Sequence, residues 1–509
     1  MTQARDSARN SAGDSAPPCN RHRAGPAAGR LIRAAVVGGG IAGLTAAWEL
    51  ARAGAQVDLY EAADRLGGAV APLHLGPVTL DAGAEAFATR SPAVPEFLAE
   101  LGLADAIVHP NPAGAWLQLP QQAAPLPATG LLGIPADPLA EDVVRILGPQ
   151  AARRAAEDLT APPSLTAEDS PSLGELVRSR MGEQVLQKLV APITSGVHSA
   201  DPDQLPASTA HPRLLPAVVE HGSLARAVAS LRAQAPAGSA VASLHGGMHT
   251  LITALRRHLD QMGLNIHLRS PVTDLHQLEA DHLVLAVDAP TAQALAAPLL
   301  AEADSPGTSR QVQNDAAAES TAAESAEERQ PGGGVALVTL LIRSPALDEH
   351  PRGTGMLVAP TVEGIGAKAL THISAKWEWV RHRLTAELGD SHHLVRLSYG
   401  RIGQAHGLGA HSTDEQLLEA AGQDIGALMG VPIAPGEILD AAVVRWQRGL
   451  PGAARQRMDA ARSLRSRLQQ AESSAGMRVT AAGAWFAGTG FAQIIPDARQ
   501  AAAALLNNS

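Results

Sequence analysis

The sequence contains little that could act as a cross-link, a metal site or a membrane anchor. Its 509 residues include one cysteine, Cys19, which has no partner for an internal disulfide. No cluster of cysteine and histidine has the spacing of metal ligands, and we predict no metal. No stretch of about 18 uninterrupted apolar residues occurs, because the run from Leu31 is broken by Arg33 and ends at Glu49. A membrane span is therefore not expected, which leaves at most a peripheral contact with a membrane.

Net positive charge and an export signal are also lacking. The net charge of −10 gives no footprint for a polyanion, so we exclude nucleic acid as a partner. Residues 1–29 are polar and contain no apolar run, which predicts a disordered tail rather than a signal peptide, and a cytoplasmic protein. The hydrophobic fraction of 45% and charged fraction of 18% indicate a soluble globular chain, long enough for two or more domains.

The first informative pattern is that of a dinucleotide-binding unit. A short apolar run at residues 31–37 precedes a glycine-rich turn and a helical pattern. Gly38 would permit the tight turn, Gly40 would let the backbone approach a pyrophosphate, and Gly43 would let the helix pack against the sheet. The phosphate would lie at the positive end of the helix. The whole turn is predicted to bind the cofactor: Gly38, Gly39, Gly40, Ile41, Ala42 and Gly43.

The residues that follow favour FAD over NAD. Glu61 comes directly after a second predicted strand, where its carboxylate would accept hydrogen bonds from ribose hydroxyls. The glycine pair of Arg65-Leu-Gly-Gly is absent from simple nicotinamide dehydrogenases. This order of strand, glycine turn, helix, glutamate and second glycine pair resembles the flavin amine oxidase superfamily. Further cofactor contacts are predicted at Ala62, Arg65, Gly67, Gly68, Gly83, Ala84, Glu85 and Ala86.

The rest of the chain is predicted to add two parts to this domain. We expect an α/β fold with α+β elements, in which a Rossmann-like FAD-binding domain carries an inserted helical lobe and a substrate domain built on a second sheet. The predicted order is a disordered tail at 1–29, the FAD-binding domain at 30–93, a mainly helical lobe at 94–240, the FAD-binding domain again at 241–300, a disordered acidic insertion at 301–334, the substrate domain at 335–475 and the end of the FAD-binding domain at 476–509.

Blocks over nearly the whole chain resemble the porphyrinogen oxidases of haem biosynthesis, the FAD family that includes protoporphyrinogen oxidase and the Gram-positive coproporphyrinogen III oxidases. The blocks more specific than the glycine turn are residues 172–182, 191–203, 244–248, 368–370, 376–377 and 488–490. The resemblance implies oxidation of coproporphyrinogen III to coproporphyrin III by molecular oxygen, with release of hydrogen peroxide, and protoporphyrinogen IX is the alternative substrate. It also leaves room for a transient contact with the next enzyme of the pathway.

The resemblance assigns further residues. Val272 resembles a position at the adenine and Trp446 a tryptophan of the flavin pocket, although each would also suit a plain core residue. At the last glycine turn, backbone N–H groups would face the flavin edge that gains negative charge. That turn contributes Gly488, Gly490, Phe491 and Gln493. Arg90 is predicted to anchor a substrate propionate, because arginine binds carboxylates through two hydrogen bonds; the alternative is a solvated loop arginine.

No side chain is predicted to be catalytic, because the flavin itself would accept the hydride. His198 and the pair His392-His393 are interpreted as surface or satisfied core residues. FAD is expected to be non-covalent, since only Cys19 could attach it and it lies in the tail. Three rival readings remain: another enzyme of the superfamily, such as an amine oxidase or a carotenoid desaturase; a flavoprotein that only binds porphyrin; and a nicotinamide-linked dehydrogenase.

Overall fold

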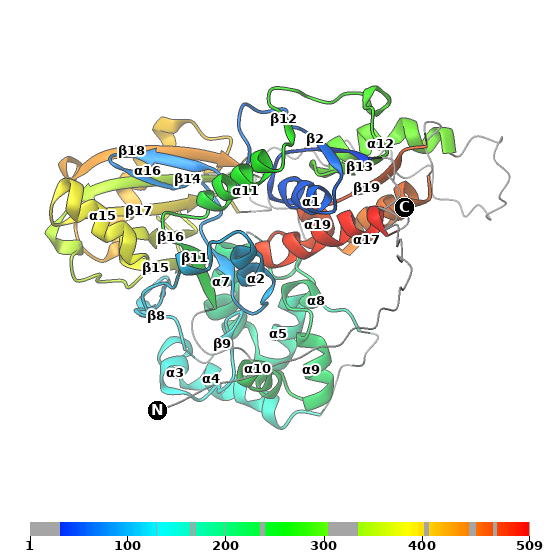
Figure 1. Cartoon of the computed structure of the whole chain (residues 1–509). Helices are drawn as coiled ribbons and strands as arrows, with labels where there is room; N and C mark the ends of the chain where they lie inside the picture. The colour runs from blue at the N-terminus through cyan, green and yellow to red at the C-terminus, as the bar shows by residue number, and fades with distance from the viewer. Residues whose placement is uncertain are drawn as a thin grey trace, which may run out of the picture.

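A computed structural model describes most of the chain. The residues described are 31–128, 130–162, 166, 169–198, 200–234, 240–303, 334–401, 407–446, 455–471 and 476–507. The predicted tail and most of the predicted acidic insertion lie outside these ranges, although helix α12 (Ala289–Ala303) includes the first residues assigned to the insertion. The described residues form two sheets with their helices and a helical lobe (Figure 1).

The first sheet is parallel and has five strands in the order β12-β2-β1-β13-β19. Its strands are β1 (Arg33–Val37), β2 (Gln56–Tyr60), β12 (Asn265–His267), β13 (His282–Leu285) and β19 (Arg478–Ala481). Ala34 to Val37 are all buried, because helices cover both faces of the sheet. One face carries α1 (Ile41–Arg52), α11 (His249–Gln261) and α19 (Phe491–Leu506), and the other α12 and α17 (Arg455–Gln470). This is the predicted Rossmann-like arrangement.

The last helix packs directly on the first one. Helices α1 and α19 lie side by side in the core (Figure 1), so the C-terminal segment completes the domain that the N-terminal strand begins. Arg499 on α19 forms ion pairs with Glu49 on α1 at 2.6 Å and with Glu100 on α2 (Ala93–Glu100) at 2.7 Å. The C-terminal helix is thereby tied by ion pairs to two helices from the first hundred residues.

The second sheet is mixed and has seven strands in the order β18-β14-β17-β16-β15-β7-β8. Its strands are β7 (Trp116–Gln118), β8 (Ala123–Pro125), β14 (Val335–Arg343), β15 (Gly355–Val358), β16 (Ala369–His372), β17 (His392–Tyr399) and β18 (Ile438–Trp446). Helix α16 (Asp414–Met429) packs on one face, and α15 (Glu378–Leu388) with the hairpin β3 (Pro72–Leu75) and β4 (Val78–Asp81) packs on the other. Strands β7 and β8 come from the segment predicted to belong to the helical lobe.

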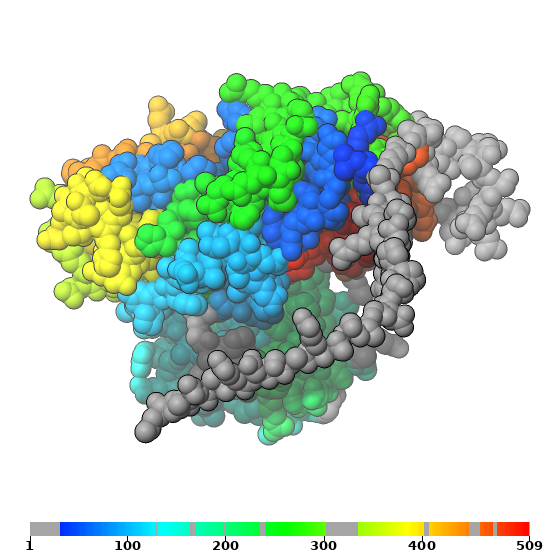
Figure 2. Space-filling view, in the orientation of Figure 1, coloured from blue at the N-terminus to red at the C-terminus, as the bar shows by residue number. Residues whose placement is uncertain are grey.

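The lobe is built mainly of helices. In the space-filling view it lies below the two sheets and is coloured teal (Figure 2). It contains α3 (Glu141–Leu147), α4 (Pro149–Ala156), η2 (Glu157–Leu159), α5 (Leu173–Met181), α6 (Glu183–Val185), the π-helical η3 (Leu186–Val190), α7 (Ala191–Ile193), the π-helical η4 (Thr194–His198), α8 (Ala207–Ala210), α9 (Leu214–His221) and α10 (Leu224–Ala233), with strands β9 (Gly130–Leu131) and β10 (Ile134–Pro135). Its buried Asp158 binds Arg180 and accepts a hydrogen bond from Ser223, which joins three helices.

Short elements connect these parts. They are β5 (Phe87–Ala88), β6 (Ile107–Val108) and β11 (Val241–Leu244), which form a three-stranded sheet, with η1 (Ala104–Ala106), η5 (Leu275–Gln277), η6 (Pro345–Leu347), α14 (Ile373–Lys376), η7 (Pro435–Glu437) and α18 (Ala484–Ala487). In the ranges given above, no helix combines the length and the hydropathy that crossing a membrane requires.

Two histidines and an aspartate are linked by hydrogen bonds at one end of the central strands β16 and β17, and the ring of His350 packs against both histidines. His393 Nε2 lies 3.1 Å from Asp348 Oδ1, and His393 Nδ1 lies 3.1 Å from His372 Nε2. If Asp348 accepts from His393, then His393 Nδ1 accepts from His372, and both rings are neutral. His393 is therefore a satisfied core residue, whereas His392 contacts backbone carbonyls. Within the described ranges, no group of three or more histidine, cysteine or acidic side chains is arranged to hold a metal ion.

This cluster predicts a loss of stability in mild acid. Burial, followed by the charges of His393 and His350, holds the pKa of His372 well below its usual value. Below about pH 6.5 the unfolded chain therefore binds a proton at His372, whereas the same side chain stays neutral in the folded chain. We expect the free energy of unfolding to drop by about 1–2 kcal/mol between pH 7 and 5 because of His372. In urea unfolding, the free energy of unfolding of His372→Gln should depend less on pH than that of wild type, whereas His382→Gln, which changes an exposed histidine, should behave like wild type. If His372→Gln and wild type showed the same pH dependence, this assignment would be contradicted.

Candidate active site

The glycine turn before α1 has the geometry of a phosphate-binding turn. Gly38 has a φ of +107°, and a Cβ there would lie 2.4 Å from the carbonyl oxygen of Ala286. A Cβ on Gly43 would lie 1.8 Å from the carbonyl oxygen of Gly38, so both glycines are required by the chain itself. A Cβ on Gly40 would meet nothing within 4 Å. The space along the Cβ direction of Gly40, at the start of α1, is therefore open, which leaves room for a pyrophosphate to approach the backbone.

Glu61 lies at the end of β2 beside this turn. Its Oε2 accepts a hydrogen bond from Gly39 N at 2.7 Å, and its Oε1 accepts one from Ala63 N at 2.7 Å. The carboxylate is thus held in place by backbone groups and is only half-buried. Since each carboxylate oxygen has a second acceptor site, Glu61 can still accept hydrogen bonds from ribose hydroxyls. The neighbouring Ala62 is exposed.

The second glycine pair packs against the first turn. Gly67 N donates to Gly39 O at 2.8 Å, and a Cβ on Gly68 would lie 3.4 Å from Gly40 Cα. Both residues have positive φ, +106° and +58°, which favours glycine. Arg65 Nη2 donates to Gly68 O at 3.1 Å. Two motifs separated in the sequence thus form one surface around the predicted pyrophosphate position.

Gly83 joins the first domain to the second sheet. A Cβ on Gly83 would lie 2.8 Å from Cζ2 of Trp446, the last residue of β18. The predicted flavin-pocket tryptophan therefore packs against the segment predicted to contact the flavin, which also contains Ala84 and Ala86. Val272 packs against the hydrophobic core on one face of the parallel sheet, and its contact with adenine stays a prediction.

The last glycine turn opens α19. Gly488 has a φ of +103°, and the side-chain Oε1 of Gln493 accepts a hydrogen bond from Gly490 N at 3.3 Å. Gln493 thereby caps the helix that Phe491 begins. The turn holds the positive end of a long helix at the end of the parallel sheet, which suits the predicted contact with a flavin edge. Among the sequence-predicted residues, these are the ones most distant in the chain from Gly38.

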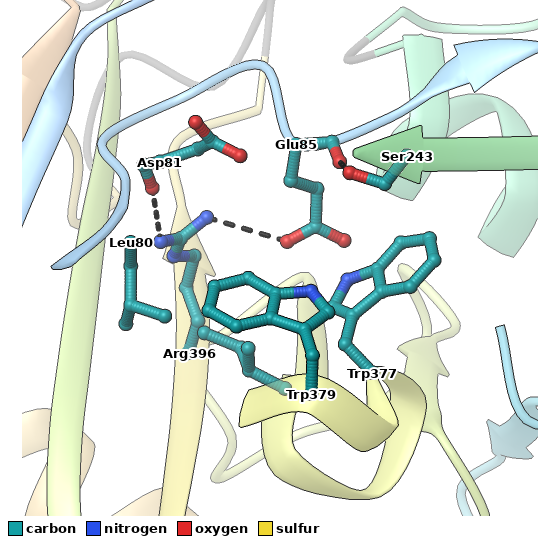
Figure 3. A pocket seen from close by; sticks show the side chains of 8 residues that line it. Leu80, Asp81, Glu85, Ser243, Trp377, Trp379 and Arg396 are labelled. Carbon is teal, nitrogen blue, oxygen red and sulfur yellow. Dashed lines mark hydrogen bonds and ion pairs between the residues drawn. The ribbon is translucent and has the colours of Figure 1, made fainter. Parts of the chain in front are cut away.

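Glu85 lies in a buried ion cluster between the first domain and the second sheet. Lys376 Nζ is 2.5 Å from Glu85 Oε1. Arg396 Nη1 is 3.4 Å from Glu85 Oε2, as Figure 3 shows. Arg396 also donates to the carbonyl of Asp81 and to Thr339 Oγ1. Burial alone would raise the pKa of Glu85, but Lys376 and Arg396 outweigh it and lower that pKa. Glu85 is therefore ionised, and its predicted flavin contact stays a prediction.

A small void lies next to this cluster. It has a volume of about 10 Å³ and is bounded by Glu85, Ser243, Arg396 and two indoles, those of Trp377 and Trp379 (Figure 3). Ser243 Oγ donates to the carbonyl of Glu85 at 2.6 Å. Trp379 Nε1 is buried and has no hydrogen-bond partner among the residues described. The void is of the size of a single water molecule, which would satisfy this N–H.

A larger cavity lies where the three parts of the molecule meet. Its volume is about 180 Å³. The first domain, the lobe and the second sheet all contribute to its lining, which comprises Gly83, Glu85, Gly196, Leu337, Ala369, Thr371, Arg396 and Ser398. The lining is mixed: the polar side chains of Glu85, Arg396, Thr371 and Ser398 lie beside the apolar Leu337 and Ala369, so polar groups that could orient a ligand converge on one space. We take it as the candidate active site.

Arg90, the predicted propionate anchor, is not among the residues that line this cavity. It is exposed on the turn after β5. Its charge acts on the lobe, where burial first and then Arg90 lower the pKa of His211. Its role in substrate binding stays a prediction. The side chain of His198 lies outside the described residues.

A glycine turn with the geometry of a phosphate-binding turn, on a parallel sheet that meets a second sheet at a cavity, is typical of two-domain flavin-dependent oxidoreductases. The chain belongs to the flavin containing amine oxidoreductase family, whose model matches residues 41–506, and within it to the porphyrinogen oxidase group. It is 31% identical over 433 residues to the coproporphyrinogen III oxidase of Mycobacterium tuberculosis (strain H37Rv), covering 82% of this chain and 86% of the relative.

Two other relatives cover more of the chain. The coproporphyrinogen III oxidase of Propionibacterium freudenreichii is 25% identical over 528 residues, with 92% of this chain and 89% of the relative covered. A crystal structure from Exiguobacterium sp. 255-15, described as a "putative protoporphyrinogen oxidase", superposes with a TM-score of 0.75 at 24% identity and covers 94% of this chain and 99% of that one. The latter likeness concerns the fold.

The sequence did not reveal that Arg396 lines the cavity or that Lys376 pairs with Glu85 beside it. Arg396 and Arg401 lie in or after a strand of the second sheet, where nothing in the local pattern separates them from surface arginines. A weak signal existed for Lys368 and Lys376, which are two of only three lysines and fall in blocks that resemble the family. The blocks mark both lysines as positions that resemble the family, but they do not indicate which side chain either lysine contacts.

Proposed function

We propose that this protein is a FAD-dependent oxidase that converts coproporphyrinogen III to coproporphyrin III in haem biosynthesis. The observation that carries the proposal is a cavity between the dinucleotide-binding domain and the second sheet, in a chain 31% identical to a coproporphyrinogen III oxidase over 82% of its length. The glycine turn, with open space in front of Gly40, fits the pyrophosphate of FAD.

Bound FAD would supply the oxidising chemistry, taking three hydrides from bridging carbons and passing the electrons to three molecules of oxygen as hydrogen peroxide, while two pyrrole N–H protons and one proton of the fourth bridging carbon are released. The chain's own residues would bind FAD and the porphyrinogen and orient them toward each other. Backbone N–H groups of the turn hold the pyrophosphate, and Glu61 accepts from the ribose. Little help from an acid or a base is needed, because the pyrrole nitrogens stabilise the cation left by hydride loss.

Porphyrinogen and molecular oxygen are the proposed partners, with FAD held non-covalently. The flavin contacts predicted for Val272, Trp446 and the last glycine turn, and the propionate contact predicted for Arg90, belong to this proposal. So do a cytoplasmic location, contact with a membrane surface and a transient contact with the enzyme that takes the porphyrin next.

The substrate is tested by assaying both porphyrinogens in air and following porphyrin fluorescence. We expect a higher kcat/KM for coproporphyrinogen III than for protoporphyrinogen IX, because two additional carboxylates require cationic or hydrated surroundings. A preference for protoporphyrinogen IX would overturn the substrate assignment. If neither is oxidised but anaerobic addition of an amine bleaches the flavin, the protein is another oxidase of the family. Binding of porphyrin without any flavin bleaching would instead identify a carrier.

A further inference from the structure

One wall of the cavity consists of two rows of side chains on the second sheet. In the first row Leu337, Ser398 and Ala369 lie opposite one another on the neighbouring strands β14, β17 and β16. In the second row Arg396 on β17 lies opposite Thr371 on β16. Because alternate residues of a strand point to the same face of a sheet, both rows face the cavity. Arg396 is the charged member of this wall.

Arg396 is also the only cation among the described residues that line the cavity, and it is already paired. Glu85, which lines the cavity as well, has its Oε2 3.4 Å from Arg396 Nη1. Arg396 further donates to the carbonyl of Asp81 and to Thr339 Oγ1. A carboxylate that entered the cavity would therefore have to displace Glu85 from Arg396.

A carboxylate without a cationic partner is unfavourable in this cavity. The two charged groups of the lining are shielded from water, since Arg396 is 6% exposed and the side chain of Glu85 is 19% exposed. Moving an unpaired carboxylate out of water into such surroundings costs free energy. A methyl group in the same place is stabilised by leaving water, and Leu337 and Ala369 offer it apolar contacts. The lining thus favours an apolar substituent over an anionic one.

The volume limits how much of a tetrapyrrole enters the cavity. At about 180 Å³ the cavity is smaller than the roughly 300–1,000 Å³ of sites that enclose a drug-sized ligand. A coproporphyrinogen carries a propionate on each of its pyrrole rings and is too large to be enclosed there. One edge of the macrocycle, a bridging carbon with the ring substituents on either side of it, would enter, and the remainder would stay outside.

The edges of coproporphyrinogen III are not alike. Each pyrrole ring carries one methyl group and one propionate, and one ring is reversed in the type III arrangement. As a result, one bridging carbon of type III lies between two methyl groups. In the type I isomer every bridging carbon lies between a methyl group and a propionate. The two isomers have the same composition and charge, and they differ in whether an edge free of propionate exists.

We propose that the cavity accepts only an edge of the macrocycle that carries no propionate, because Glu85 neutralises Arg396, and that the protein therefore discriminates coproporphyrinogen III from coproporphyrinogen I. This inference rests on the proposed function, for which Glu85 becomes a specificity-determining residue. The propionates of coproporphyrinogen III would remain hydrated outside the cavity.

The test compares kcat/KM for the two isomers in air by porphyrin fluorescence, after subtraction of the rate without protein. Wild type should prefer isomer III roughly 10- to 100-fold, the loss expected when one charged group is left unpaired. Glu85→Gln, assayed at equal flavin content, should reduce this preference to about threefold or less, because Arg396 can then bind a propionate.

A second pair of variants leaves the ion pair of Glu85 and Arg396 in place. Ser398→Lys adds an ammonium group to the wall of the cavity, so it should also reduce the preference for isomer III. Ser398→Met is the matched control, because its side chain has a similar length and no charge. It should keep the wild-type preference even where the rates for both isomers fall.

The outcomes separate this inference from the function on which it rests. Equal kcat/KM for the two isomers in wild type overturns the inference, whereas the proposed function stands because coproporphyrinogen III is oxidised. An unchanged preference in either Glu85→Gln or Ser398→Lys at full flavin content also overturns it, since the discrimination would then arise elsewhere. If Glu85→Gln fails to hold FAD, the comparison of Ser398→Lys with Ser398→Met decides. If wild type oxidises neither isomer, the proposed function itself fails, and the inference with it.

Discussion

Gly40→Val should yield a folded protein without flavin. A Cβ on Gly40 meets nothing within 4 Å, so the apoprotein has room for the new side chain. The same space is where the backbone must approach the pyrophosphate of FAD, and an isopropyl group would occupy it. We expect flavin content to fall from stoichiometric to undetectable and activity to disappear with it, while circular dichroism and soluble yield stay close to wild type. Flavin absorbance of the purified protein measures the first effect.

Two further glycines give this experiment its controls. A Cβ on Gly43 would lie 1.8 Å from a backbone oxygen, so Gly43→Val should prevent folding rather than only flavin binding. Gly422 in α16 has nothing within 4 Å of its Cβ and lies on the second sheet, so Gly422→Val should retain both fold and flavin. Normal flavin content in Gly40→Val would show that the turn does not bind the cofactor. Loss of fold in Gly40→Val would show that the chain, not a ligand, requires this glycine.

Glu85→Gln should be strongly destabilising. The substitution keeps the shape of the side chain but leaves Arg396, which is 6% exposed, and Lys376 without their carboxylate. Removing one partner of a buried ion pair costs about 3–5 kcal/mol, because the remaining charge stays desolvated. Urea unfolding followed by tryptophan fluorescence measures the loss. Glu279→Gln, which removes an ion pair between exposed side chains, should cost less than about 1 kcal/mol.

A second substitution should restore part of the stability. Lys376→Met in the Glu85→Gln background removes one of the two uncompensated cations, so the double variant should be more stable than Glu85→Gln alone. If the free energy of unfolding of Glu85→Gln lies within about 1 kcal/mol of the wild-type value, the cluster does not hold the two sheets together.

The pH profile supplies an independent test of Glu85. Because the pKa of Glu85 is lowered on folding, its stabilising effect is present above the usual glutamate pKa of about 4.3 and is lost as the pH falls through the folded value. Glu85→Gln should therefore be destabilised most at neutral pH and approach the wild-type stability in strong acid. A constant difference at every pH would contradict the ionised state of Glu85.

Local patterns predicted the parallel sheet well. Strand β1, its glycine turn and α1 follow from a short apolar run and from glycines whose backbone the turn requires. The terminal helix was expected to end at Leu506, as observed. Strands β7 and β8, however, were assigned to a helical lobe. Each has only three residues, too few for a period of two to be recognised, and β7 is held in place by hydrogen bonds to the distant β15.

The sequence by itself indicated the flavin amine oxidase family and the porphyrinogen oxidase group, and it predicted the dinucleotide-binding turn, because these depend on residues close together in the chain and on blocks that resemble the family. Only the tertiary structure determined which charged side chains lie in contact. Glu85 and Lys376 are 291 positions apart, and the pairing of β16 with β17 places Lys368 near Arg401. Whether an arginine is solvated, neutralised or available to an anion depends on what folding brings beside it, and no local pattern records that.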